Sequence, residues 1–306
     1  MKTRVSWAEL PRSVRAGVER ILGETVVTAQ SQTGGFSPGS ADRVVLASGR
    51  RAFVKAVSAE SNATSPVLHR REAAVAKALP PGIPAPKFLG MYDDGTWVAL
   101  VLDDVSGTHP REPWQESELL HVLDRLADIG CVELPADVPL PQYEDSLRGA
   151  FRGWEKLASR PMAGMPAWEA EHLGLLAGLA KEGVEALAGG SLVHGDLRTD
   201  NIMLTDSGPV LLDWPWAAVG APWADALSVL INATTLDPLS GWDHVLKEHR
   251  VFAAASDAGV TGVLAGWAGY FLDMSRRPAP PGIPTLRAFQ ARQAEVITGW
   301  LRKRLS

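Results

Sequence analysis

The most informative stretch of this sequence is Leu192-Val193-His194-Gly195-Asp196-Leu197-Arg198-Thr199-Asp200-Asn201-Ile202-Met203-Leu204. Its apolar start, polar middle and apolar end predict a strand, a loop and a second strand. The turn at residues 205–208 reverses the chain into a third apolar run, residues 210–212, with Asp213 at its end. We therefore expect Asp196, Asn201 and Asp213 at the ends of short packed strands, on one side of a hairpin.

Two carboxylates and one carboxamide in this arrangement suit a hard divalent cation, because such cations prefer oxygen ligands. A carboxylate that does not bind the cation is then free to accept a proton from a substrate. The pattern therefore predicts a site for metal-assisted chemistry. The alternative, that these residues are ordinary polar loop residues, explains the complete arrangement less well.

The residues before this segment predict a small sheet and one helix. The expected helix, residues 66–79, begins after Ser65 with a proline at its first position and ends before Pro80. The expected strands are residues 26–29, 43–46, 52–57, 88–92 and 97–102. Beyond Trp114 we expect long helices, near residues 115–129, 144–158, 168–187, 222–234, 242–258, 260–275 and 285–304. The fold class is therefore α+β, with a small antiparallel sheet followed by a larger helical part.

Lys55 and Glu72 are charged residues at positions that face the predicted core. Lys55 shares one face of its strand with Phe53 and Val57. Glu72 lies in the apolar stripe of the helix 66–79, which consists of Leu68, Glu72, Val75 and Leu79. Because burying either charge unpaired is costly, we predict that the two residues form an ion pair. The alternative is a lysine that extends to solvent and a glutamate at the rim of the helix.

The turn Gly34-Gly35-Phe36-Ser37 lies between the first two predicted strands. Glycines let backbone amides approach phosphate oxygens closely, so the turn is a candidate for phosphate binding. It lacks both the G-x-x-x-x-G-K-[ST] and the G-x-G-x-x-G patterns. An ordinary hairpin loop would have a similar sequence, so the turn alone does not distinguish the two.

Taken together, His194-Gly195-Asp196 with Asn201 and then Leu212-Asp213-Trp214 strongly resembles the aminoglycoside phosphotransferase family. Members of this family are relatives of the protein kinases that phosphorylate small molecules. The resemblance covers most of the chain in the expected order, including a hinge at Asp103–Val105. It implies a bilobal, protein-kinase-like fold. Residues 1–104 would form the nucleotide-binding lobe, and residues 105–306 would form the helical lobe for catalysis and acceptor binding.

By this resemblance, Asp196 matches the catalytic aspartate that accepts or orients the proton of the acceptor hydroxyl. Arg198 lies where many kinases place a lysine near the γ-phosphate. Asn201 and Asp213 match the ligands of Mg²⁺. The residues implied in nucleotide binding are Lys55, held by Glu72 on the α- and β-phosphates, together with Gly34, Gly35, Phe36, Ser37, Asp103 and Val105. The implied cofactors are Mg²⁺ and ATP, with GTP as the alternative nucleotide.

His194 resembles the histidine that braces the catalytic loop, and Asp225 resembles an aspartate that stabilises this loop. Two positions depart from the family pattern: Trp214 replaces the phenylalanine of the kinase D-F-G motif, and Pro215 stands where many relatives carry an acidic residue. No A-P-E segment with an activation loop follows, which disfavours a protein kinase. A nucleotide-binding protein without activity is disfavoured because every catalytic position is filled.

Composition excludes several other classes of protein. The 306 residues carry a net charge of −5 and a pI of about 5.8, whereas nucleic-acid binders are usually basic. No apolar run reaches the length of a membrane span, and the first nine residues lack the apolar core of a signal peptide. Cys131 is the only cysteine, so no intrachain disulfide forms. We expect a cytoplasmic protein without a nucleic-acid, membrane or obligate protein partner.

The acceptor is suggested only by the distribution of charge and tryptophan. Residues 1–105 contain 13 basic and 10 acidic residues, and the remainder contains 17 basic and 25 acidic residues. The acidic remainder favours a cationic acceptor such as an aminoglycoside or a basic peptide antibiotic. Eight of the eleven tryptophans lie at or beyond Trp154, and these would also suit a sugar or a macrolide. Sugars, choline-like alcohols, amino-alcohols and macrolides therefore remain alternatives.

Overall fold

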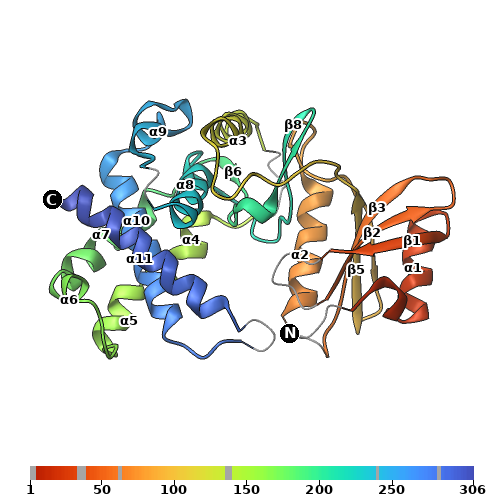
Figure 1. The fold of residues 1–306 in the computed structure, drawn as a ribbon, viewed down its shortest axis with the longest axis horizontal. Coiled ribbons are helices and arrows are strands. Elements are labelled where there is room, and N and C mark those ends of the chain that lie inside the picture. The colour runs from red at the N-terminus through yellow and green to blue at the C-terminus, as the bar shows by residue number, and fades with distance from the viewer. Residues whose placement is uncertain (1–4, 33–38, 61–63, 135–139, 239–240, 281–283) are drawn as a thin grey trace. The chain divides into compact units, whose positions relative to one another are not determined.

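The structure is a computed structural model that describes residues 5–32, 39–60, 64–134, 140–238, 241–280 and 284–306. The chain folds into two compact units (Figure 1). Unit 1 comprises residues 1–109 and 200–216, and unit 2 comprises residues 110–199 and 217–306. The hairpin that carries Asn201 and Asp213 therefore belongs to the same unit as the N-terminal sheet.

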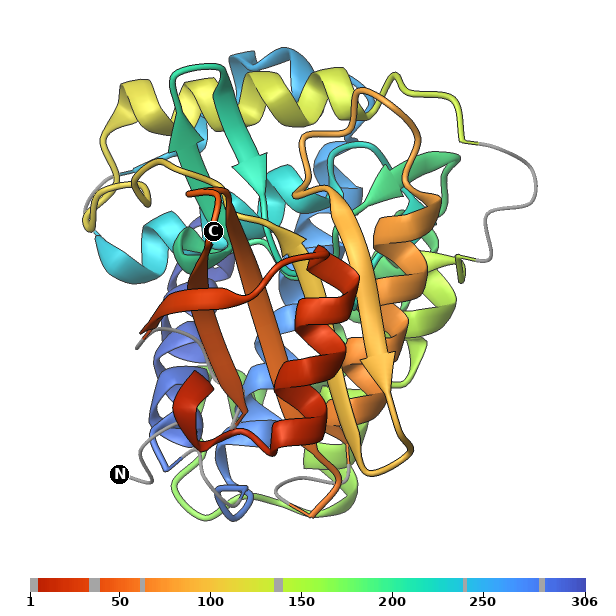
Figure 2. The same cartoon turned by 90° about the vertical axis from the view of Figure 1, so that its right-hand side faces the viewer.

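Unit 1 is built on a five-stranded antiparallel sheet with the strand order β1-β2-β3-β5-β4. The strands are β1 (Val26–Ser31), β2 (Ser40–Leu46), β3 (Arg51–Ser58), β4 (Phe88–Asp93) and β5 (Trp97–Asp103). Alternate residues of β3 face opposite sides, as the period of a strand requires. Ala52 and Val54 pack in the core under α1 (Arg12–Leu22), whereas Phe53 packs against residues of α2 (Ser65–Ala78). The predicted antiparallel sheet and α+β fold class are confirmed (Figure 2).

The sequence pattern predicted one helix in this region, and α1 was not predicted. Its buried residues Val14, Val18 and Leu22 are spaced four apart, which places them on one face of the helix. The helix follows Pro11 and ends at Gly23, whose φ of 76° is left-handed. These signals are visible in the sequence, but the helix has only 11 residues and lies before the first strand.

The hairpin of unit 1 consists of β7 (Ile202–Thr205) and β8 (Gly208–Leu211). Thr108 pairs with Leu204 through two backbone hydrogen bonds of 3.0 and 2.7 Å. His109 bonds through Nδ1 to the carbonyl oxygen of Ile202 at 2.8 Å. Gly107 allows this close approach, because a Cβ there would lie 2.3 Å from the carbonyl oxygen of Leu204. These hydrogen bonds thus hold the hairpin against the segment that follows β5.

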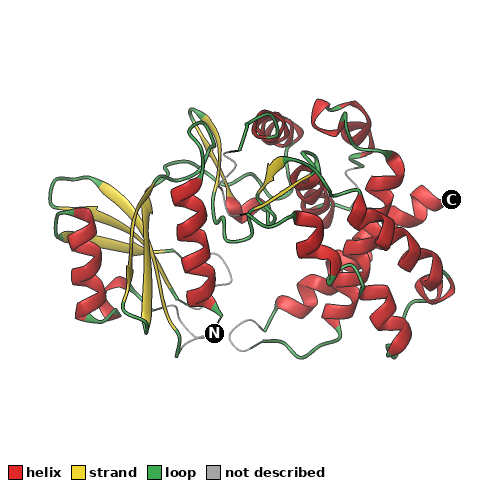
Figure 3. Ribbon diagram, turned by 180° about the vertical axis from the view of Figure 1, so that it is seen from behind, coloured by secondary structure: helices red, strands yellow, loops and turns green. Residues whose placement is uncertain are grey.

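The described residues of unit 2 are mostly helical, with one short antiparallel pair of strands, β6 (Ser191–Val193) and β9 (Ala218–Gly220) (Figure 3). Its helices are α3 (Glu116–Ile129), α4 (Tyr143–Arg148), α5 (Gly153–Ser159), α6 (Ala167–Glu171), α7 (Leu173–Glu185), α8 (Ala224–Leu236), α9 (Asp243–Glu248), α10 (Asp257–Ser275) and α11 (Leu286–Leu305). Among the described residues, no helix is both long enough and apolar enough to span a membrane.

Three predicted helices of unit 2 are divided in the structure. Residues 144–158 form α4 and α5, and residues 168–187 form α6 and α7. The segment 242–258 is broken where His249 adopts an extended conformation, and α10 begins afresh where the Ser256 side chain accepts a hydrogen bond from the amide of Gly259. The Ser256 N-cap was a visible signal for the last of these breaks, and the predicted helix 242–258 overran it.

The core of unit 2 is organised around α10, which packs against α5, α7 and α11. Gly183 of α7 lies directly against Gly262 of α10, because a Cβ on Gly183 would come within 2.2 Å of the Gly262 backbone. Trp154 is fully buried, and its indole N–H donates to the carbonyl oxygen of Ala265 at 2.7 Å. Small residues on α10 therefore let its neighbours pack close to its backbone.

Candidate active site

Unit 1 contains a largely buried lysine, with a 17% exposed side chain, between two carboxylates. Lys55 Nζ lies 2.8 Å from Glu72 Oε1 and 3.1 Å from Asp213 Oδ1. Glu72 is 3% exposed, so the predicted charge within the apolar helical stripe is buried and paired as expected. Asp213, whose side chain is 44% exposed, is a second partner that the sequence analysis did not assign to Lys55.

The electrostatics of this cluster favour a protonated lysine. Burial lowers the pKa of Lys55, but the carboxylates of Asp213 and Glu72 outweigh it, and the pKa lies above its usual value. Burial raises the pKa of Glu72 to about 7, although the Lys55 ammonium opposes this shift. One ammonium faces two carboxylates, so the cluster can accept further positive charge.

His69 is a buried neighbour of this cluster that the sequence analysis missed. It precedes Glu72 by three residues on α2, so helical spacing places it on the same face. Burial, and to a smaller extent the Lys55 cation, lower the pKa of His69 to about 4. A neutral imidazole therefore lies beside the lysine without adding a charge.

Asp213 is the one non-glycine residue with a left-handed backbone among those that the structure describes, with φ of 67°. Aspartate and asparagine tolerate this conformation better than most residues. The amide of Leu212 donates to the carbonyl oxygen of Asn201 at 2.8 Å, and the indole of the buried Trp214 donates to the carbonyl oxygen of Leu211 at 2.8 Å. These contacts fix the backbone on both sides of the carboxylate.

Asn201 and Asp213 are the residues of unit 1 that could hold a weakly chelated Mg²⁺. Among the described residues, no group of three or more histidine, cysteine, aspartate or glutamate side chains is placed to hold a metal ion by itself. Mg²⁺ usually takes only one or two carboxylates from a protein and fills its other positions with water and phosphate oxygens. A partly exposed aspartate together with an asparagine of the same hairpin provides oxygen donors of that kind.

The predicted hinge is held by two arginines that the sequence analysis missed. Asp104 accepts ion pairs from Arg43 at 3.2 Å and from Arg51 at 2.8 Å, and its side chain is 2% exposed. Arg43 also donates to the carbonyl oxygen of Val105 at 3.1 Å, and the amide of Asp103 donates to the Lys87 carbonyl at 2.9 Å. Arg43 lies on β2 and Arg51 on β3, and the pairing of these strands brings both side chains to Asp104. Their shared partner is visible only in the tertiary structure.

The candidate phosphate turn lies outside the described residues. Gly34, Gly35, Phe36 and Ser37 all fall within the segment 33–38.

In unit 2, Asp196 lies on a loop that is held by hydrogen bonds to a side chain of α8. Asp225 accepts hydrogen bonds from the amides of His194 and Gly195, at 2.6 and 2.9 Å. Gly195 has a φ of 81°, which a side chain would strain. His194 is 1% exposed, and its Nδ1 accepts from the amide of Asp196 at 3.3 Å. The bracing that the resemblance implied for His194 and Asp225 is therefore present.

Asp196 lies near both a cation and a phenol of unit 2. Its carboxylate Oδ1 is 3.4 Å from Nη1 of Arg198, and both side chains are partly exposed. Tyr143 is buried, and its pKa is raised by burial and then by the charges of Asp225 and Asp196. The Asp196 carboxylate is thus partly exposed to solvent, whereas Tyr143 and Asp225 are buried.

Asn232 is a further anchor of the loop that the sequence analysis missed. Its side-chain oxygen accepts from Thr199 N at 3.2 Å, from Thr199 Oγ1 at 2.8 Å and from Trp114 Nε1 at 3.2 Å. Asn232 follows Asp225 by seven residues, so both lie on the same face of α8. An asparagine seven residues after Asp225, within an otherwise apolar helix, was the sequence signal that could have identified this anchor.

Replacement of Asp225 by asparagine should change how stability depends on pH. Burial raises the pKa of Asp225 to about 6 against the two amide hydrogen bonds, whereas the unfolded chain has the ordinary value of 3.8. The native state therefore binds the proton more tightly, and this group's contribution is greatest below pH 4 and is lost as the pH rises through 6. Urea denaturation at pH 4 and pH 7 should show the stability advantage of the wild type over Asp225→Asn shrinking by about 2–3 kcal/mol. An advantage that stays constant or grows with pH would contradict this assignment.

Comparisons with known proteins bear on the family and the fold of the chain. A family model described as the phosphotransferase enzyme family matches residues 35–255. The choline kinase LicA from Streptococcus pneumoniae has 13% identity and a TM-score of 0.62, over 95% of this chain and 98% of that chain. An aminoglycoside phosphotransferase from Alicyclobacillus acidocaldarius has 15% identity and a TM-score of 0.57, over 96% and 95%.

A third similar solved structure contains two bound ligands. A thermostable mutant of the aminoglycoside phosphotransferase APH(4)-Ia, crystallised with ADP and hygromycin B, has 14% identity and a TM-score of 0.60, over 94% of this chain and 98% of that chain. No curated protein matches the sequence. At these identities the solved structures establish the fold, which is that of the protein-kinase-like phosphotransferases.

Proposed function

This chain belongs to the phosphotransferase enzyme family, and on that basis we propose that it transfers the γ-phosphoryl group of ATP to a hydroxyl group of a small acceptor. Members of this family and the structural neighbours are small-molecule kinases, so the reaction class follows from membership. The nucleotide, the metal and the residue roles are the parts that we propose here.

The observation that carries the proposal is the placement of Lys55 between Glu72 and Asp213. An ion pair from helix to strand aims the lysine at a phosphate, and the aspartate beside it supplies an oxygen ligand for a metal. A purely structural ion pair would need one carboxylate, whereas this lysine has two. The arrangement therefore supports a site for nucleoside triphosphate and metal.

In the proposed reaction, each residue binds or orients a group. Lys55 binds the α- and β-phosphates, and Asn201 and Asp213 hold Mg²⁺, which neutralises phosphate charge when bound. Asp196 accepts a hydrogen bond from the acceptor hydroxyl and aligns its oxygen for in-line attack. Arg198 binds the γ-phosphate near that carboxylate. Positioning and charge neutralisation account for most of the rate, because the transfer asks little covalent chemistry of the protein.

The proposed nucleotide is ATP, with GTP as the alternative. The ADP complex of the APH(4)-Ia mutant supports an adenine nucleotide for this fold. We propose that the base binds the backbone at Asp103 and Val105, whose conformation is set by the Arg43–Asp104 contact. The prediction that the turn binds phosphate through Gly34, Gly35, Phe36 and Ser37 remains a prediction.

The acceptor expected from net charge is an aminoglycoside or a related antibiotic. Small metabolic alcohols are the second candidate class of acceptor, because a choline kinase is among the structural neighbours. Both classes present a hydroxyl to the same carboxylate, so they share the mechanism above.

A test of the function measures ADP release with Mg²⁺-ATP over a panel of aminoglycosides, macrolides, sugars and amino-alcohols. We expect release that depends on one class of acceptor, with product mass increased by one phosphate. Transfer to a generic protein substrate instead, or nucleotide binding without release across the whole panel, would contradict the proposal.

A double-mutant cycle tests the role of the lysine pair. Lys55→Met should lower kcat/KM by about 10²-fold, because it removes one preorganised cation from the phosphates. Glu72→Gln should cost less, since it only positions the lysine, and the double variant should equal Lys55→Met within a few-fold. The matched control is Arg70→Gln on α2. Arg70 forms a partly exposed ion pair with Asp93 at 2.7 Å and has no proposed role in nucleotide binding. Losses that add in the double variant would show that the two residues act independently.

A further inference from the structure

Unit 2 contains a pocket of about 660 Å³ that lies along α11. Residues of α6, of the end of α8, of the start of α9 and of the C-terminal half of α10 complete its walls. Pockets of this size commonly bind small molecules. The described residues that line it include none of those assigned above to the nucleotide, the metal or the acceptor hydroxyl. The pocket is therefore separate from the proposed active site.

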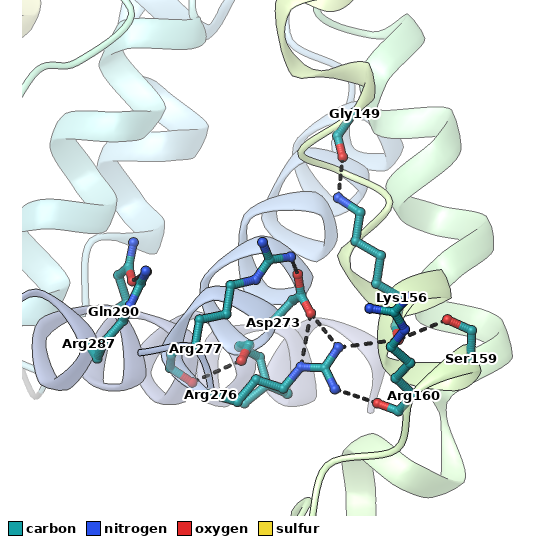
Figure 4. A network of polar contacts seen from close by, with 11 residues as sticks. Gly149, Lys156, Ser159, Arg160, Asp273, Arg276, Arg277, Arg287 and Gln290 are labelled. Carbon is teal, nitrogen blue, oxygen red and sulfur yellow. Dashed lines mark hydrogen bonds and ion pairs between the residues drawn. The ribbon is translucent and has the colours of Figure 1, made fainter. Parts of the chain in front are cut away.

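A polar network holds the α10 wall of the pocket in place (Figure 4). Leu272 lines the pocket, and the next residue, Asp273, accepts a hydrogen bond from Arg276 at 2.6 Å. Arg276 also donates to the carbonyl oxygen of Lys156, near the end of α5, at 3.3 Å. The part of α10 that carries Leu272 is thus joined to α5.

Side chains of α11 hold the other walls. Arg302 forms an ion pair of 2.8 Å with Glu169 of α6, and Arg292 donates at 3.3 Å to a carbonyl oxygen in the last turn of α8. Trp300 Nε1 donates to Asp243 Oδ1, at the start of α9, at 2.8 Å. Because each wall is joined to α5 or to α11, the pocket is formed before any ligand binds.

Gly299 leaves a gap in the side of α11 that lines the pocket. Glycine is one of the least favourable residues within a helix, and Gly299 lies well inside the range of α11. A Cβ at this position would have no neighbouring heavy atom within 4 Å, so close packing does not require glycine there. The missing side chain leaves room for a ligand beside the helix.

Two opposite charges border this gap. Lys303 follows Gly299 by four residues, and helical side chains lean toward the N-terminus, which directs the lysine toward the gap. Asp243 is half-buried and is held by the indole of Trp300, the residue next to Gly299. Within the described part of the chain, neither Lys303 nor Asp243 forms an ion pair. The pocket therefore offers both a cation and an anion to a ligand.

The other charged side chains of the lining balance one another. Glu169 and Arg302 form the ion pair described above, and Arg292 and Glu295 are three residues apart on α11. The described lining residues thus comprise three acidic and three basic side chains, namely Glu169, Asp243, Glu295, Arg292, Arg302 and Lys303. This composition favours neither a net cation nor a net anion.

We propose that this pocket is a second ligand-binding site of unit 2, for a zwitterionic small molecule with a large apolar side chain, such as a free aromatic amino acid. Asp243 binds its ammonium group, Lys303 binds its carboxylate, and its apolar part fills the gap at Gly299 beside Trp242 and Val296. Hydrogen bonds between charged groups are stronger than neutral ones. A zwitterion makes both of them, whereas a singly charged molecule makes one and a neutral molecule makes none.

Four probes that share an indole ring test the charge preference. Tryptophan, tryptamine, indole-3-propionate and indole are titrated into the full chain without nucleotide, and binding is followed by ligand-observed NMR. Tryptophan should bind at least about tenfold more tightly than indole, with the two singly charged probes between them. Tryptophan that binds no more tightly than indole, or less tightly than either singly charged probe, would overturn the proposal.

Gly299→Leu tests the location of the site. Leucine fills the gap, so all four probes should bind at least about tenfold more weakly. Because leucine favours a helix and a Cβ at this position meets no neighbouring atom, the Tm of the variant should not fall. Gly178→Leu on α7 is the matched control, since a Cβ there also meets no atom within 4 Å and Gly178 does not line the pocket. Unchanged binding of tryptophan to folded Gly299→Leu would also overturn the proposal.

Two further substitutions assign the charged ends of the ligand. Asp243→Asn keeps an oxygen for the Trp300 indole, and it should weaken tryptophan and tryptamine about tenfold without affecting indole-3-propionate. Lys303→Gln should weaken tryptophan and indole-3-propionate without affecting tryptamine, and Lys303→Arg should keep the affinity. Lys247→Gln, an exposed change on α9 outside the lining, is the control. Equal losses for all four probes in either charge variant would contradict the assigned ends.

These measurements separate the inference from the proposed function. Binding of the probes requires neither nucleotide nor phosphoryl transfer, so a site that responds to the variants as expected in a protein without kinase activity would contradict only the function. An active kinase that binds none of the four probes would contradict only the inference.

Discussion

Replacement of Asp196 by asparagine is expected to lower kcat by about 10²–10⁴-fold, which is the range of a positioned acid–base group. Asparagine keeps the size of the side chain and its place on the loop, but it neither accepts the proton nor attracts the hydroxyl hydrogen as strongly. The backbone contacts that hold this loop run through the amides of His194 and Gly195, and they do not involve the Asp196 side chain. The loop should therefore keep its conformation in the variant.

Nucleotide affinity provides the internal control for Asp196→Asn. Because the carboxylate is proposed to face the acceptor, the Kd for Mg²⁺-ATP should stay within a few-fold of the wild-type value. Asp145→Asn on α4, where the aspartate makes an exposed ion pair of 3.6 Å with Arg148, serves as a matched control for loss of one charge in the same unit. Turnover close to that of the wild type would remove Asp196 from the mechanism.

The second large effect is expected for Asp213→Asn. Asparagine tolerates the left-handed backbone at φ of 67°, so this variant tests the charge without straining the chain, unlike Asp213→Ala. Loss of the carboxylate should reduce kcat/KM by about 10³-fold, because a metal ion supplies several kcal/mol of charge stabilisation. Lys55 would keep Glu72 as its partner at 2.8 Å, so the fold of unit 1 should survive.

Calorimetry distinguishes a metal ligand from a structural partner of the lysine. The non-hydrolysable nucleotide AMP-PNP should bind Asp213→Asn with an affinity that no longer increases when Mg²⁺ is added. Asp206→Asn is the control, because Asp206 lies on the exposed turn of the same hairpin. An unchanged response to Mg²⁺ in Asp213→Asn would remove this residue from the metal site.

Local patterns in the sequence predicted those parts of the site that depend on one element at a time. Strand alternation placed Lys55 toward the core, helical spacing placed Glu72 there, and the cost of burying a charge joined them. The two residues are 17 positions apart, and they meet at 2.8 Å. The roles of Asp196, Asn201 and Asp213 came from the family resemblance, and the residues alone indicated only oxygen ligands at strand ends.

Contacts between distant segments were not predictable in the same way. Lys55 and Asp213 are 158 positions apart, and nothing in their spacing indicates that they meet. The clamp of Arg43 and Arg51 on Asp104 depends equally on strand register and on where β5 ends.

The two buried acceptors on α8 have a consequence for the motion of the loop that they hold. Asp225 binds the amides at the start of the loop, and Asn232 binds the amide of Thr199 at its end. Both acceptors sit on one face of a helix that is almost wholly buried, so releasing either end of the loop requires α8 to move. The amide protons of His194, Gly195 and Thr199 should then exchange with deuterium only through large openings of unit 2, as slowly as those of its core helices. The loop that carries Asp196 would be among the most slowly exchanging segments of the unit, although it has no regular secondary structure around that residue.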